Sequence, residues 1–152
     1  MADLTEGKKA PVFSLPDQDG NKVSLADFSG QTVVLYFYPK DMTPGCTQQA
    51  CDFQENSSKL KRKNTVVLGI SRDSVARHKK FQEKYGLKFS LLSDEDGSIC
   101  EKYGVWKEKS LYGKKFMGIE RTTFIIDKSG KIEKIFSKVK VKNHVADLIA
   151  GL

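Results

Sequence analysis

Residues 33–51 read VVLYFYPKDMTPGCTQQAC and decide the fold, because they join two apolar runs of different period. The first six residues are β-branched, aromatic or aliphatic and are followed by a proline, which is typical of a buried strand. From Cys46 onward, apolar residues recur every three to four positions, which predicts a helix from about Cys46 to Lys61. The residues on this stripe are Cys46, Ala50, Phe53 and Leu60. Cys46 therefore lies at the junction of a strand and a helix, on the core-facing side of the first turn.

This position makes Cys46 the candidate nucleophile. The unpaired N–H groups and the positive dipole end at a helix start favour a thiolate over a thiol, and the thiolate is the reactive form. Thr43 could cap a helix N–H or donate to a bound oxygen, and Gly45 lets the backbone approach a small ligand closely. The alternative is a helix start that contains an unreactive cysteine, since free cysteines are often simply buried.

A resemblance to a known family makes the first interpretation more specific. The pattern PxxxTxxC at residues 39–46 resembles the active-site motif of the peroxiredoxins. Its continuation PGCTxxAC at residues 44–51 resembles the subfamily of bacterioferritin comigratory protein, or peroxiredoxin Q. The likeness covers nearly the whole chain and includes LLSDED at 91–96 and GIERTTFIID at 118–127.

The resemblance implies an α/β, thioredoxin-like fold with an N-terminal β-hairpin extension and a central mixed sheet flanked by helices. It also implies a thiol-dependent peroxidase that reduces hydrogen peroxide and organic hydroperoxides, with Cys46 oxidised to a sulfenic acid. Arg121 matches the peroxiredoxin arginine, and its charged fork could stabilise the thiolate and polarise the peroxide. Thr43 would be a second donor to the leaving oxygen, and Pro39 would wall the pocket and exclude water. The alternative for Arg121 is a surface residue at the head of a strand.

Cys51 is the candidate resolving thiol, which would form a disulfide with Cys46 that thioredoxin or a similar dithiol protein recycles. Five residues apart on an unbroken helix, the two Cα atoms would be about 8.6 Å apart. A disulfide tolerates roughly 7 Å, so the helix must first unwind by a turn or two. The alternative is that another thiol resolves Cys46. Cys100 is predicted as a core residue, with a resolving role as its alternative.

Three other polar residues complete the expected site and its surroundings. Gln49 departs from the family, in which a glutamate is frequent there, so one charge near Cys46 is missing. His78 and His144 stand among charged or polar residues and are predicted to face solvent. A Cys-x4-Cys spacing without a second pair is a poor zinc signature, so we expect neither a metal nor a bound cofactor.

Composition limits the other function classes. The 152 residues fit a single domain, 1–152, and contain no run of about 18 apolar residues and no signal-peptide pattern. We therefore expect a cytoplasmic protein, and in that reducing compartment an odd count of three cysteines favours catalysis or metal binding over a framework of structural disulfides. The net charge of +7 comes from dispersed lysines without a nucleic-acid-binding motif, so no specific nucleic-acid or membrane partner is predicted. By resemblance, we expect a monomer.

Periodicity and turn residues outline the rest of the chain. Two successive strand–helix passes after residue 33 predict parallel βαβ pairing. The predicted strands are 11–15 and 22–25 as a hairpin, then 33–38, 65–70, 89–92, 122–126 and 131–136. The predicted helices after the first are 73–85, 98–103 and 143–152, and 107–120 is predicted as a surface loop.

Two competing functions remain at this stage. A thiol–disulfide oxidoreductase would place its two thiols as Cys-x-x-Cys, a spacing that this chain lacks. A basic binding or chaperone-like module would explain the charge but not the combination of Thr43, Cys46 and Arg121.

Overall fold

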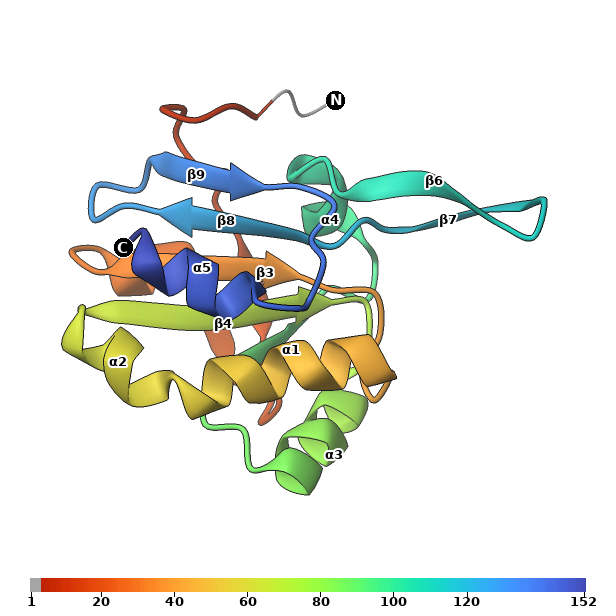
Figure 1. Ribbon diagram of the computed structural model, residues 1–152, viewed down its shortest axis with the longest axis horizontal. Helices are drawn as coiled ribbons and strands as arrows, with labels where there is room; N and C mark the ends of the chain where they lie inside the picture. The colour runs from red at the N-terminus through yellow and green to blue at the C-terminus, as the bar shows by residue number, and fades with distance from the viewer. Residues whose placement is uncertain (1–3) are drawn as a thin grey trace.

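The computed structural model describes residues 4–152 and is organised around a five-stranded mixed sheet (Figure 1). The strand order is β5-β4-β3-β8-β9. The three strands β3, β4 and β5 run parallel to one another, whereas β8 and β9 add antiparallel neighbours. The bounds are β3 Thr32–Phe37, β4 Thr65–Ser71, β5 Ser90–Ser93, β8 Thr122–Ile126 and β9 Ile132–Phe136. The central strand is the apolar run that precedes Cys46.

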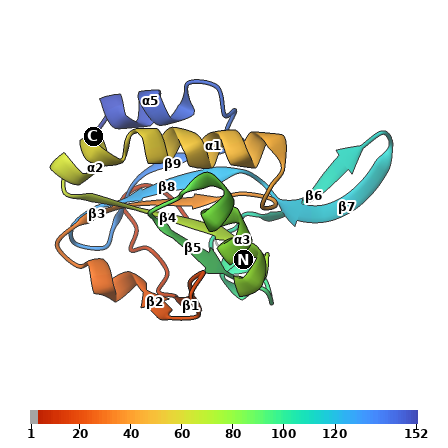
Figure 2. The ribbon, with the colours of Figure 1, turned by 90° about the horizontal axis from the view of Figure 1, so that it is seen from below.

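Both faces of β3 are buried, which explains its continuous apolar sequence. Alternate residues enter two separate core clusters, with Val34 and Tyr36 in one and Val33 and Leu35 in the other. One face is covered by α1 (Pro44–Glu55), α2 (Ser57–Arg62), α3 (Val75–Tyr85) and α5 (His144–Ala150). Figure 2 shows α1, α2 and α5 as one layer above the sheet. Within residues 4–152, none of the helices has the length and apolar character needed to cross a membrane.

The opposite face is covered by the N-terminal part of the chain and by one later helix. The hairpin of β1 (Ser14–Pro16) and β2 (Lys22–Ser24) lies there, followed by the 3₁₀ turn η1 (Leu25–Phe28) (Figure 2). The helix α4 (Ser98–Lys102) contributes Ile99 and Cys100 to the core cluster of the same face. This arrangement is the predicted α/β fold with a central mixed sheet, flanking helices and an N-terminal hairpin extension.

The loop prediction for residues 107–120 is wrong. The segment forms an antiparallel hairpin, β6 (Trp106–Leu111) and β7 (Lys114–Ile119), which projects beyond the end of the sheet (Figures 1 and 2). Most of its side chains are exposed on both faces, so the apolar and polar alternation that marks a half-buried strand is lost. Exposed apolar side chains gather on it: Leu111, Tyr112, Phe116 and Met117.

The prediction of one continuous helix from about Cys46 to Lys61 is also wrong, because the segment forms two helices, α1 and α2. The first begins two residues earlier than predicted, at Pro44, with Thr43 as the N-cap, and the second ends at Arg62, close to the predicted end. The break lies at Asn56, whose amide Nδ2 donates to the carbonyl of Asp52 at 2.8 Å. An asparagine that bonds its own backbone competes with the helical pattern, which accounts for the break between α1 and α2.

Candidate active site

Cys46 is the third residue of α1 and is 1% exposed. Its side chain enters the core cluster beneath α1, together with Tyr36 and Tyr38 of the preceding strand segment. The predicted position at a strand–helix junction, facing the core, is therefore confirmed. The start of a helix places N–H groups and the positive dipole end beside this sulfur.

Arg121 stands directly before β8 and reaches Cys46 across the top of the sheet. Its Nη2 donates to Cys46 Sγ at 3.3 Å, and its Nη1 donates to Gln49 Oε1 at 2.6 Å. Two residues on one face of α1 thus hold both arms of the guanidinium. A fixed cation beside the sulfur favours the thiolate, which is the nucleophilic form.

Gly45 makes room for this contact. A Cβ at residue 45 would lie 3.3 Å from Arg121 Nη2, closer than side-chain carbons ordinarily approach. The space left by the missing side chain of Gly45 is thus used by the arginine of this chain, and the predicted close approach to a ligand stays a prediction. Any larger residue would push the guanidinium away from Cys46.

Gln49 is fully buried and serves as a neutral acceptor for Arg121. A glutamate there would pair with the guanidinium and offset its charge, whereas the amide fixes its position and leaves the charge intact. The other end of the amide, Nε2, has no hydrogen-bond partner among residues 4–152. A buried donor without a partner is costly, so this nitrogen is held at some expense of stability for the sake of the contact between Oε1 and Arg121.

Thr43 and Pro39 belong to the loop that joins β3 to α1. The hydroxyl of Thr43 donates to the carbonyl of Lys40 at 2.9 Å and makes no cap bond to α1 in the described chain, contrary to one predicted use. Donation to a bound oxygen requires the hydroxyl to rotate away from Lys40. Thr43 is therefore close in sequence to the thiol, but its proton is engaged elsewhere.

Pro39 lines a surface groove of about 460 Å³ beneath the projecting hairpin. The groove combines apolar side chains with cations: Lys40, Arg72, Trp106, Lys109, Phe116 and Met117 are among its lining residues. Trp106 forms part of this wall and carries the guanidinium of Arg72 over its ring at 4.6 Å. The pKa of Lys109 is lowered, mainly because the side chain is partly buried and also because the positive charge of Arg121 is near. Cys46, Thr43 and Arg121 are not among the lining residues of this groove, so the role of Pro39 as a wall of the peroxide pocket stays a prediction.

Cys51 lies five residues beyond Cys46 on the same unbroken helix and is half-buried. All three cysteines, each within the described residues, are free thiols. Ideal helix geometry separates the Cα atoms of Cys46 and Cys51 by about 8.6 Å, so a disulfide between them requires α1 to unwind. Partial burial and the carboxylates of Glu55 and Asp52 raise the pKa of Cys51.

Comparison with known proteins identifies the family. Residues 6–135 match the model of the AhpC/TSA family. The chain belongs to the AhpC/TSA family. Peroxiredoxin Bcp of Escherichia coli is 54% identical over 144 residues, which cover 95% of this chain and 92% of that protein. A putative peroxiredoxin bcp of Coxiella burnetii is 53% identical over 146 residues, covering 96% and 97% of the two chains.

Solved structures agree with this assignment. A cysteine-to-serine mutant of Xylella fastidiosa PrxQ has a TM-score of 0.93 at 34% identity and covers 99% of this chain and 96% of its own. The bacterioferritin comigratory protein of Xanthomonas campestris, solved to study its alkyl peroxide reduction, has a TM-score of 0.90 at 36% identity over 97% and 96%. The thioredoxin-like fold, the peroxiredoxin family and the thiol peroxidase function predicted from the sequence are therefore confirmed.

The predictions that His78 and His144 face solvent are wrong. His78 is fully buried, and its Nδ1 lies 2.6 Å from Asp41 Oδ2. His144 is buried at the start of α5, where its Nε2 contacts the hydroxyl of Thr123 at 3.0 Å and burial lowers its pKa. The partners of the two histidines lie 37 and 21 residues away in the sequence. The polar residues next to each histidine therefore suggested exposure, although long-range contacts bury both side chains.

Cys100 is fully buried in α4, as predicted for a core residue. It belongs to the core cluster on the face of the sheet opposite that of Cys46. Burial and the carboxylate of Asp94 raise the pKa of its thiol. The sheet thus separates Cys100 from Cys46, which argues against a resolving role within one chain.

Proposed function

We propose that Cys46 is the peroxidatic thiol of this peroxidase and that Arg121 activates it. The contact of 3.3 Å between Arg121 Nη2 and Cys46 Sγ is the observation that carries the proposal. The thiolate attacks one peroxide oxygen, the O–O bond breaks, and Cys46 becomes a sulfenic acid. The other oxygen leaves as hydroxide or alkoxide and takes up a proton to give water or an alcohol.

Negative charge develops on the leaving oxygen, so the site needs fixed donors around it. Arg121 supplies one, because it is already oriented by Gln49. Thr43 supplies another once its hydroxyl turns from the Lys40 carbonyl, and the backbone N–H of Cys46 is a third. We propose that Pro39, which also lines the groove, shields Cys46 from water on one side.

We further propose that Cys51 resolves the sulfenic acid. After α1 unwinds, the Cys51 thiolate attacks Cys46 Sγ and the S–O bond breaks, so a disulfide forms and the sulfenic oxygen leaves as hydroxide, which takes up a proton from solvent to give water. The helix is only 12 residues long and ends at the Asn56 break, which limits what must be unfolded. If Cys51 does not act, a thiol from another molecule must take its place.

The family implies peroxide substrates and a thioredoxin-like dithiol reductant. We propose that both hydrogen peroxide and organic hydroperoxides react, since the groove beside Pro39 offers apolar contacts to an organic substituent. We also propose one domain, 1–152, that acts as a monomer in the cytoplasm without specific nucleic-acid binding. The three free cysteines are in keeping with a reducing compartment.

The test is intact mass and free-thiol count after one equivalent of hydrogen peroxide, on the wild type, Cys46→Ser and Cys51→Ser. The wild type should lose two thiols and two hydrogens, because an intramolecular disulfide forms. Cys51→Ser should gain one oxygen at Cys46 or form a disulfide-linked dimer, and Cys46→Ser should remain unoxidised. A persistent sulfenic acid in the wild type would overturn the role of Cys51, and an unreactive Cys46 would overturn the whole proposal.

A further inference from the structure

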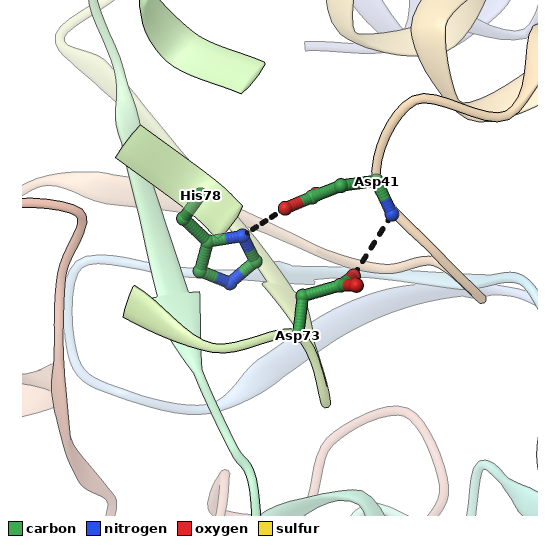
Figure 3. Close-up of side chains that lie close together, drawn as sticks. All are labelled: Asp41, Asp73 and His78. Carbon is green, nitrogen blue, oxygen red and sulfur yellow. Dashed lines mark hydrogen bonds and ion pairs between the residues drawn. The ribbon is translucent and has the colours of Figure 1, made fainter. Parts of the chain in front are cut away.

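A buried polar cluster lies beside the loop that carries the proposed active-site residues. Asp41 belongs to the loop between β3 and α1, whereas Asp73 precedes α3 and His78 is part of it. Figure 3 shows the three side chains converging, with Asp41 bonded to both of the others. Asp41 and His78 are both fully buried. No step of the peroxidase chemistry described above uses this cluster.

Every polar group of Asp41 is engaged. Its N–H donates to Asp73 Oδ2 at 2.8 Å, and its carbonyl accepts from Arg77 Nη2 at 3.2 Å. Its Oδ1 accepts from the Tyr38 hydroxyl at 2.5 Å, and its Oδ2 lies 2.6 Å from His78 Nδ1. Three of these four partners come from α3 or the turn before it. One loop residue is thus fixed to α3 through both backbone and side chain.

His78 connects this loop residue to the sheet. Its Nε2 lies 3.0 Å from the carbonyl of Leu92 in β5, and a carbonyl only accepts, so Nε2 carries a hydrogen. The short contact between Nδ1 and Asp41 Oδ2 then holds one shared proton, because two bare acceptors would repel each other at 2.6 Å. In either placement of that proton, the two side chains together carry no net charge. Such a pair is buried at far lower cost than a lone ion.

The cluster has the composition of a cation site but not the chemistry of one. Ligand atoms of Asp41, Asp73 and His78 lie within 4.8 Å of one another. However, the His78 nitrogen and the Asp41 oxygen that would bind an ion already bind each other. The Arg77 guanidinium also contacts Asp73 Oδ1 at 3.1 Å and the Asp41 carbonyl. A fixed cation in the same cluster opposes the binding of a second one.

We propose that His78 is a positioning residue for the peroxidase reaction, which acts through Asp41 on the loop 39–43. The next residue, Met42, has a backbone φ of +65°, which residues other than glycine rarely adopt. Such a conformation persists only where neighbours enforce it, and here Asp41 is fixed on one side while Thr43 bonds Lys40 on the other. His78 thereby sets where Thr43 and Pro39 stand relative to Cys46. The inference rests on the proposed roles of those residues.

Two substitutions of His78 separate its two hydrogen bonds. In His78→Asn the amide nitrogen takes the place of Nδ1 and can still donate to Asp41, whereas the bond to Leu92 is lost. In His78→Gln the longer side chain reaches the Leu92 carbonyl and leaves Asp41 without its partner. The experiment measures the second-order rate of Cys46 oxidation by hydrogen peroxide for both variants and the wild type. The thermal unfolding midpoint of each protein is recorded in parallel.

The rate for His78→Gln should fall about tenfold, because small displacements of positioned groups are costly, whereas His78→Asn should stay within about threefold of the wild type. Equal rates in all three proteins would overturn the inference. It would also be overturned if the oxidation rates of the two variants followed their unfolding midpoints, whether or not the bond to Asp41 is kept. Tyr38→Phe removes the hydroxyl that donates to Asp41 Oδ1 and lies 3.5 Å from His78 Nδ1. It keeps the contact between His78 and Asp41 and provides the test if neither His78 variant folds, because a rate equal to that of the wild type would then overturn the role of Asp41. A wild type that fails to react with peroxide would instead refute the proposed function.

Discussion

Cys46 and Cys100 occupy the same position in two different helices. Each is the third residue of its helix, and each is almost completely buried. At α1 the guanidinium of Arg121 faces the sulfur. At α4 the N–H groups of Ile99 and Cys100 donate to the carboxylate of Asp94, so a negative charge occupies the helix start.

The difference shows that burial and a helix N-terminus do not by themselves make a reactive cysteine. A carboxylate at the helix start uses the N–H groups and opposes a thiolate, and burial removes the water that would solvate one. A guanidinium at the same place supports the thiolate in an equally buried site. The sign of the neighbouring charge separates the proposed nucleophile from the core cysteine. Changing that charge, or the cysteines themselves, should therefore change the reactivity of each thiol in a predictable direction.

The largest effect is expected from removing the positive charge at Cys46. Arg121→Gln should lower the second-order rate of Cys46 oxidation by hydrogen peroxide about 100- to 1,000-fold, as for loss of a key transition-state donor. Arg121→Lys is the matched control, because it retains the charge but loses the fork that Gln49 orients. In a stopped-flow measurement, the oxidation rate of Arg121→Lys should lie between those of the wild type and Arg121→Gln. A rate for Arg121→Gln within threefold of the wild type would refute the role of this contact.

The second effect concerns the pH dependence of disulfide formation. Partial burial, Glu55 and Asp52 raise the pKa of Cys51, so its thiol is protonated at neutral pH. The thiolate fraction, and with it the rate at which the sulfenic acid disappears, should rise about tenfold per pH unit below that pKa. Rapid quenching after one equivalent of peroxide, between pH 6.5 and 8.5, measures this rate. Glu55→Gln should raise it at pH 7, whereas a pH-independent rate would show that unwinding of α1 is limiting.

A smaller effect is expected from giving Cys46 the charge environment of Cys100. Gln49→Glu places a carboxylate against Arg121, where the wild type has a neutral amide. Residue 49 is fully buried and Arg121 is half-buried, so this pair is less screened than a surface ion pair, which is worth up to about 1 kcal/mol. The oxidation rate should therefore fall about five- to tenfold. Gln49→Met, which removes the acceptor without adding charge, is the control for lost orientation. A faster reaction in Gln49→Glu would show that the charge of Arg121 is not what limits the wild type.

Much of the fold could be predicted because its central elements are buried in regular patterns. The apolar run that forms β3 and the stripe that includes Cys46 and Phe53 carry clear periods of their own. The hairpin β6–β7 was missed because both of its faces are exposed, so burial imposes no period on it. The break at Asn56 depends on one side-chain bond, which apolar periodicity does not report.

The sequence likewise identified some residues of the site and missed others. Cys46, Cys51, Thr43 and Pro39 stand close together in the sequence, and Arg121 was found by its match to a family motif. His78 gave no such signal, because the partner that buries it is 37 residues away and its neighbours in α3 are charged. Asp41 lies inside the motif but at one of its variable positions, so its contacts required the three-dimensional arrangement. Long-range polar contacts of this kind are what the sequence alone did not reveal.

The smallest effect on activity is expected at Cys100. Cys100→Ser should leave the peroxidase rate within twofold of the wild type, because the hydroxyl of the introduced serine can donate to Asp94 in the same space.

The wild type and Cys100→Ser should instead differ in how their stability depends on pH. The folded state raises the pKa of the thiol, so above about pH 8.5 the unfolded chain ionises while the folded one does not. The free energy of unfolding should therefore fall more steeply with pH in the wild type than in Cys100→Ser, as measured by urea denaturation from pH 7 to 10. Equal slopes, or native-state alkylation of Cys100 at neutral pH, would mean that Asp94 and burial do not suppress its thiolate, and the contrast with Cys46 would lose its electrostatic basis.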